Sequence, residues 1–217
     1  MGWWLADLFH DNKALLVSHI VWVIGSICLH ELAHGWAAIR MGDRTPIESG
    51  HMTWNPMVHM GPTSLIVFLI IGFAWGAMPV NPSRLRGRHA DAIVAFAGPA
   101  MNLLLAAFSI VALALWSKYA TGLDPGLYDN FTVFFLAGGF LNLVLAALNL
   151  LPIPPLDGSR IVASFSPWFR NLLDQPNAMM VGLVLAVIAM NVFGGPVSRF
   201  ATDTVTACVT AIRGVLP

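Results

Sequence analysis

Residues 14–41 read ALLVSHIVWVIGSICLHELAHGWAAIRM, and this apolar stretch contains the H-E-x-x-H motif His30-Glu31-Leu32-Ala33-His34. Glu31 is the only acidic residue of the stretch. Because a carboxylate in hydrocarbon is costly, an ionisable group at this position predicts a functional site. Residues four apart on an α-helix lie on the same face. His30 and His34 can therefore point both imidazoles at one metal ion, with Glu31 beside them as a base towards a water molecule.

The composition is that of a membrane protein with several spans. Of the 217 residues, 57% are hydrophobic and 10% are charged, and the mean hydropathy is +0.73. A soluble domain carries about 25% charged residues. With this composition we expect the lipid bilayer as a partner. The formal net charge is zero, so we expect no nucleic acid as a partner. No internal repeat or linker divides the sequence, so we expect one membrane-embedded domain over residues 1–217.

Four apolar stretches are long enough to cross a bilayer, so the sequence predicts an all-α polytopic fold. We expect these spans at about 14–41, 90–117, 130–151 and 176–193. A fifth stretch, 63–78, is shorter and contains glycines. It favours a re-entrant or interfacial segment, because irregular backbone at membrane depth must be covered by protein or water.

Two further segments do not fit a full span. The polar, turn-rich segment 42–61 predicts short strands or a small β-hairpin at the membrane interface. Residues 197–216 have apolar residues at helical spacing, but Asp203 and Arg213 interrupt them. This helix therefore either lies on the membrane or packs on the bundle, and the sequence leaves both placements open.

The basic residues indicate the orientation in the membrane. If 42–89 begins and ends on one side, seven of the 11 lysines and arginines flank helix ends on that side and four flank the other. By the positive-inside rule, the arginine-rich side faces the cytoplasm. The H-E-x-x-H helix then runs inward, and 63–78 cannot cross the membrane only once. The seven residues are Arg40, Arg44, Arg84, Arg86, Arg88, Arg160 and Arg170.

A catalytic metal needs a third protein ligand, and Asp157 is the best candidate. It follows a proline-rich break at 152–155 and is the only acidic residue in 130–173. The predicted topology brings it to the depth of His34 in the cytoplasmic half of the bundle. Two imidazoles, one carboxylate and an open fourth position describe catalytic zinc, so we expect one Zn²⁺ per chain. The alternative is an ordinary turn residue before Gly158.

Three motifs together resemble those of the site-2 protease family of intramembrane zinc metalloproteases. They are the H-E-x-x-H motif, Gly98-Pro99-Ala100-Met101-Asn102, and the segment from Asn149 to Gly158. The chain is most similar to the compact bacterial and archaeal branch, without a PDZ or CBS domain. The resemblance implies that Glu31 is the catalytic base. It also implies that Asn149 binds the substrate, a role we assign to Asn102 as well, and that zinc is held by His30, His34 and Asp157.

The sequence therefore predicts an intramembrane zinc metalloprotease. Its partners would be single-pass membrane proteins or peptides, cut in or near their transmembrane segments in regulated intramembrane proteolysis. We expect it in the inner (cell) membrane of a prokaryote, with the active site towards the cytoplasm. A metal-ion transporter is an alternative, but transporters usually have repeated halves. An inactive membrane-substrate binder is a second alternative, against which the intact Glu31 argues. The oligomeric state is left open.

Overall fold

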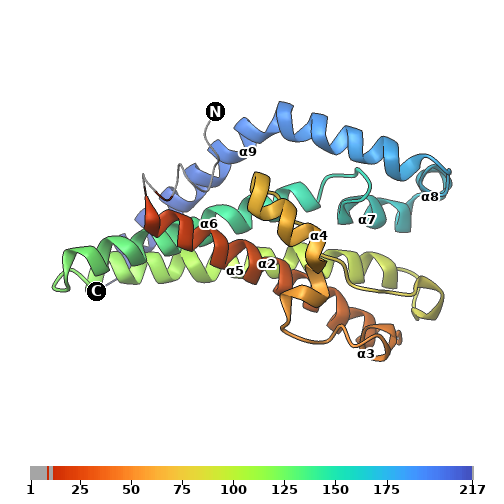
Figure 1. The fold of residues 1–217 in the computed structure, drawn as a ribbon, viewed down its shortest axis with the longest axis horizontal. Helices are drawn as coiled ribbons and strands as arrows, with labels where there is room; N and C mark the ends of the chain where they lie inside the picture. Colours follow the sequence, from red (N-terminus) through yellow and green to blue (C-terminus); the bar gives the residue numbers. More distant parts are fainter. Residues whose placement is uncertain (1–8, 10–11, 217) are drawn as a thin grey trace.

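The computed structural model describes Phe9 and residues 12–216, and every regular element in this range is helical (Figure 1). Four helices are long and apolar enough to cross a membrane. The predictions of an all-α membrane protein and of four spans are thereby confirmed. The four helices are α2 (Lys13–Arg40), α5 (Ala90–Tyr119), α6 (Pro125–Asn149) and α9 (Ala178–Val215).

Helices α2, α5 and α6 pack together, and α2 is the innermost of the four spans. In its most apolar window 56% of the residues are buried, against 11% in the corresponding window of α9. Close packing of α2 on α6 depends on Gly138, where an added Cβ would lie 2.3 Å from Cε2 of Trp22. The Asp124 side chain caps α6 by accepting from the N–H of Leu127. The motif-bearing helix is therefore held in the middle of the protein.

Residues 176–193 and 197–216 belong to one element rather than two. The single helix α9 continues through Pro196 to Val215. Its second half packs on the bundle, where Val205 contacts Ile110 and Leu113 of α5. Of the two placements left open by the sequence for residues 197–216, the structure shows packing on the bundle.

The predicted β-hairpin in 42–61 is wrong. This segment holds the short helix α3 (Thr45–Glu48), turns and the start of α4, and the described part of the chain contains no strand. The cause lies in Asp43, whose carboxylate accepts from the backbone N–H of Thr45 at 2.9 Å and from its hydroxyl at 2.5 Å. Such a side-chain turn, followed by Pro46, starts a helical turn instead of an extended strand.

After helix α4 (Pro56–Ile71) the chain returns to the end of α2. Residues 73–81, which we call the return segment, have no regular structure. The N–H of Asn81 donates to Asp43 Oδ2 at 2.7 Å. The chain thus leaves and rejoins the same end of α2, which is the path expected of a re-entrant segment over 63–78.

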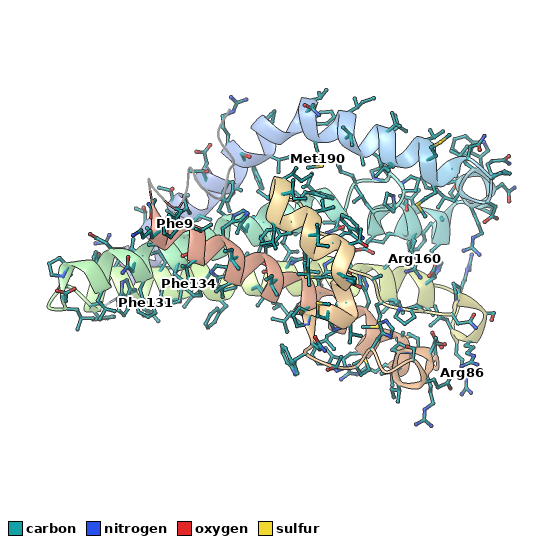
Figure 2. The ribbon with its side chains drawn as sticks, viewed as in Figure 1. Phe9, Arg86, Phe131, Phe134, Arg160 and Met190 are labelled. Atoms are coloured by element: carbon teal, nitrogen blue, oxygen red, sulfur yellow. The ribbon has the colours of Figure 1, made fainter. Side chains whose placement is uncertain are left out.

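The remaining elements gather at one end of the bundle, which we call the arginine end. They are the 3-10 turn η1 (Pro82–Arg84), α7 (Asp157–Phe165) and α8 (Pro167–Leu173). Figure 2 shows Arg86 and Arg160 at this end, whereas Phe131 and Phe134 of α6 lie towards the other end. The arrangement agrees with the sidedness expected from the basic residues.

Candidate metal centre

Three side chains from distant parts of the chain meet between α2 and the start of α7. His30 Nε2 lies 3.0 Å from His34 Nε2, and Asp157 Oδ2 lies 3.1 Å from the first and 3.3 Å from the second. A tetrahedral zinc site with metal–ligand bonds of about 2.0–2.1 Å places its ligand atoms about 3.3–3.4 Å apart. The triangle formed by the predicted ligands is therefore close to the size that zinc requires, and smaller by up to about 0.4 Å.

Hydrogen bonds at the far side of each ring set the tautomer of the neutral imidazole, with the proton on Nδ1 and the facing Nε2 free to bind a metal. His34 Nδ1 lies 2.7 Å from the Val94 carbonyl, which can only accept, so this nitrogen carries the proton. His30 Nδ1 lies 2.7 Å from Asn102 Oδ1 and donates in the same way. Asp157 Oδ2, the third member, is buried and makes no hydrogen bond of good geometry in the described structure. Three electron-rich atoms share one buried space, and a bound cation is the natural partner for them.

The proton position on His30 follows from a chain of buried amides. The Gly138 carbonyl of α6 accepts from Asn142 Nδ2 at 3.0 Å, so Asn142 Oδ1 is left to accept from Asn102 Nδ2, also at 3.0 Å. Asn102 Oδ1 therefore faces His30 Nδ1 as an acceptor. Both asparagines are completely buried. Substrate binding by Asn102 stays a prediction, but its contacts are those of a residue that orients a metal ligand.

Two glycines leave room at this centre. A Cβ on Gly98 would lie 2.4 Å from His34 Nε2 and 2.5 Å from His30 Nε2, so any side chain would enter the space between the ligands. A Cβ on Gly76 would lie 2.6 Å from Glu31 Oε1. The return segment therefore runs directly against the Glu31 carboxylate, which is only 7% exposed.

The position of Asp157 is fixed by its own helix. Asp157 is the first residue of α7, and a Cβ on the following Gly158 would lie 2.3 Å from the Leu150 carbonyl oxygen. The connection from α6 is therefore tightly packed. One turn further along α7, Arg160 Nη2 donates to Asp91 Oδ1 of α5 at 2.6 Å. Contacts to α6 and α5 thus hold the carboxylate where the two histidines can meet it.

Some features of the centre were not predicted. The Val94 carbonyl has no side-chain signature, so nothing in the sequence marks it. Asn142 did carry a signal, since an amide inside an apolar span usually has a specific partner. Asn149, expected to bind substrate, is half-buried on the last turn of α6 and donates to the Leu145 carbonyl at 3.1 Å. This contact does not test the expected role.

Comparisons with known proteins agree with this chemistry. A family model described as peptidase family M50 matches residues 18–125 and 119–192. YwhC of Bacillus subtilis, named as a candidate zinc metalloprotease, is 38% identical over 68% of this chain and 68% of its own length. Rip2 of Mycolicibacterium smegmatis and Rip2 of Mycobacterium tuberculosis are named likewise and are 36% and 33% identical. These two matches cover 73% and 69% of this chain, but 61% and 56% of the Rip2 proteins. No solved structure gives a significant match.

Proposed function

We propose a function from one premise: the chain belongs to peptidase family M50, the site-2 proteases. It is therefore a zinc metalloprotease and an integral membrane protein. We propose that it hydrolyses peptide bonds in or near the transmembrane segments of membrane-anchored proteins. The observation that most supports this proposal is the His30, His34 and Asp157 triangle, which lies inside a bundle of apolar helices.

The residues present fit a zinc ion held by His30, His34 and Asp157. When bound, zinc supplies Lewis acidity, which makes water nucleophilic near neutral pH and polarises the scissile carbonyl. The contribution of the chain is to fix the tautomer of both imidazoles, with Nε2 turned inwards. Val94 and Asn102 do this by accepting the Nδ1 protons.

Glu31 is the group that moves protons in this proposal. It directly follows His30 on α2 and is nearly buried. Its carboxylate takes a proton from the attacking water and later passes a proton to the nitrogen of the leaving amine. Because Glu31 is 7% exposed and the return segment lies against it, little bulk water competes for these protons.

The substrate backbone needs hydrogen-bond partners, because a transmembrane helix must unwind before its peptide bonds can be reached. The segment 42–61 contains no strand with which an unwound substrate could pair. The backbone that runs beside Glu31 is the return segment, and we infer that the unwound substrate binds along it. Asn149 offers a further donor and acceptor close to the α6–α7 connection.

The proposed orientation places the arginine end in the cytoplasm of a prokaryotic cell. The contact between Asn81 and Asp43 supports it, because it returns the chain to the same end of α2 before α5 begins. Helix α5 then runs outward and α6 runs inward, which delivers Asp157 to the arginine end. The site would thus open towards the cytoplasm.

The test is cleavage of a labelled single-pass substrate by the zinc-loaded protein in lipid nanodiscs. We expect Glu31→Gln to keep one zinc per chain and to lower cleavage about 10²–10⁴-fold, the usual effect of losing a general base. Asn149→Ala should keep zinc and weaken cleavage. Glu48→Gln is the matched control, since this exposed glutamate pairs with Arg84 away from the centre.

Two results would contradict the proposal in different ways. Wild-type turnover by the Glu31→Gln variant would remove Glu31 from the mechanism. Cleavage of soluble peptides, but of no membrane-anchored substrate, would leave a metalloprotease and reject the membrane substrate.

A further inference from the structure

A cavity of about 520 Å³ lies at the arginine end, apart from the metal centre. It is formed between the residues that precede α5 and the joint of α7 with α8. Neither Glu31 nor a metal ligand is among the described residues that line it. The side chains relevant to its chemistry are Arg88, His89, Ser164, Phe165, Arg170 and Asn171.

The lining is basic and carries no carboxylate. Arg88 and Arg170 both face the cavity, and no aspartate or glutamate lines it. Arg84 and Arg160, at the same end of the protein, are each paired with a carboxylate at 2.6 Å. In the described part of the chain neither Arg88 nor Arg170 has a carboxylate within 4.0 Å. Two guanidinium groups at one cavity therefore lack an anionic partner from the protein.

Two buried polar atoms of the same cavity residues also lack a partner. They are His89 Nδ1 and Ser164 Oγ, neither of which makes a hydrogen bond in the described structure. Buried polar atoms in proteins nearly always have a partner. The His89 ring is held in place by stacking on Phe165, with ring centres 4.6 Å apart. Both atoms are themselves covered, so the polar groups that the lining offers to a ligand are the two guanidinium groups and the Asn171 amide, which suit an anion with several oxygens.

We propose that this cavity binds the phosphate group of an anionic phospholipid. Arginine binds phosphate through paired, charge-assisted hydrogen bonds, and basic pockets on the cytoplasmic side of membrane proteins bind anionic headgroups. The volume lies within the range of small-ligand sites. A lipid is favoured over a soluble phosphate because Phe165 lines the cavity and Trp168 and Leu172 lie next to lining residues on α8. Phe165, Trp168 and Leu172 are 63%, 73% and 48% exposed, and an acyl chain would cover them.

Occupancy of this cavity would join elements that position the metal centre. A phosphate held by Arg88, before α5, and by Arg170, on α8, would bridge the start of α5 and the α7–α8 joint. It would act in parallel with the ion pair between Arg160 and Asp91. The lipid would thereby stabilise α7, whose first residue is Asp157. Lipid binding can be measured without any peptidase activity, so its failure is distinguishable from failure of the proposed function.

The experiment measures lipid retention by native mass spectrometry on the purified full chain in detergent. Phosphatidylglycerol, phosphatidylcholine and inorganic phosphate are titrated separately, and lipid-dependent thermal stability is recorded in parallel. The test variant is Arg88→Gln with Arg170→Gln, and Asn171→Ala is a second variant with unchanged charge. Arg40→Gln with Arg44→Gln is the control, because it removes two exposed arginines of the same end outside the cavity. Thermal stability without lipid verifies that each variant is folded.

We expect phosphatidylglycerol to bind more tightly than phosphatidylcholine, and the Arg88/Arg170 variant to lose about 30-fold in affinity. This follows if each arginine near an anionic headgroup contributes about fivefold. The control should bind like the wild type, and Asn171→Ala should show a smaller loss. Equal binding of the two lipids, or equal binding by the variant and the control, would overturn the proposal. Complete displacement of the lipid by millimolar inorganic phosphate would reject the lipid as the ligand and assign the site to a soluble phosphate.

Discussion

Replacing Gly98 with alanine tests the geometry of the metal centre with a single methyl group. The added carbon would lie 2.4 Å from His34 Nε2 and 2.5 Å from His30 Nε2. Real Cβ contacts under 3.0 Å essentially never occur, so a ring or the helix must move. Relieving such overpacking typically costs about 1–3 kcal/mol, which corresponds to a rise of about 5- to 150-fold in the dissociation constant for zinc.

The assay is zinc competition against a chelating indicator, using metal-free protein in detergent. Thermal unfolding of the metal-free protein is measured at the same time, since it reports folding independently of zinc. Glycine to alanine within a helix adds up to about 1 kcal/mol of stability through helix propensity. Gly25→Ala on α2 is the control for this gain in helix propensity, because a Cβ there would meet nothing within 4 Å.

We expect Gly25→Ala to bind zinc like the wild type and Gly98→Ala to bind it at least fivefold more weakly. If both variants bound zinc with wild-type affinity, the two imidazole nitrogens could not face Gly98 as described. The centre would then have to use another set of ligand atoms.

Three further outcomes follow from the structure. Asn102→Ala should raise the zinc dissociation constant about 10- to 100-fold, as loss of a partner that orients a metal ligand usually does; unchanged affinity would remove this role. Burial alone would raise the pKa of Asp43, but the three hydrogen bonds it accepts hold that pKa below the usual 3.8. The stability contributed by the ionised carboxylate should therefore be present above about pH 4 and be lost as the pH falls further, and Asp43→Asn should flatten this part of the thermal stability profile. Cysteines replacing Arg44 and Arg88 in a cysteine-free background should label from the same side of sealed vesicles, and labelling from opposite sides would reject the re-entrant path.

The sequence predicted those features that depend on local spacing or on the cost of burying charge. Helical periodicity placed His30 and His34 on one face, and hydropathy located four spans. The reasoning about basic residues brought Asp157 to the same end of the bundle as His34. Each of these inferences rests on a strong energetic constraint, because hydrocarbon tolerates neither an unpaired charge nor unsatisfied backbone.

The errors and omissions arise where side chains decide the backbone locally or where the backbone itself is the partner. Turn-forming residues suggested a hairpin in 42–61, but the Asp43 carboxylate bonds Thr45 and starts a helical turn. The segments 176–193 and 197–216 were expected as separate elements, but α9 continues through Pro196 and joins them. The Val94 carbonyl and the contact of Gly76 with Glu31 are set by how whole helices pack, and no residue pattern encodes them.

The line of amides from Gly138 through Asn142 and Asn102 to His30 has a consequence for how this protein can evolve. Asn102 donates to Asn142, and Asn142 donates to the Gly138 carbonyl, and both side chains are fully buried. Changing one asparagine to an apolar residue therefore leaves the other with a buried polar atom that has no hydrogen-bond partner. Replacing both asparagines with apolar residues of similar shape leaves no unpaired amide, but it also removes the Asn102 oxygen that accepts from the His30 imidazole. Sequences diverging from this one should therefore keep the two asparagines as an inherited pair or exchange them jointly for another donor–acceptor pair. The site would then leave a trace of correlated substitution between these two positions of α5 and α6.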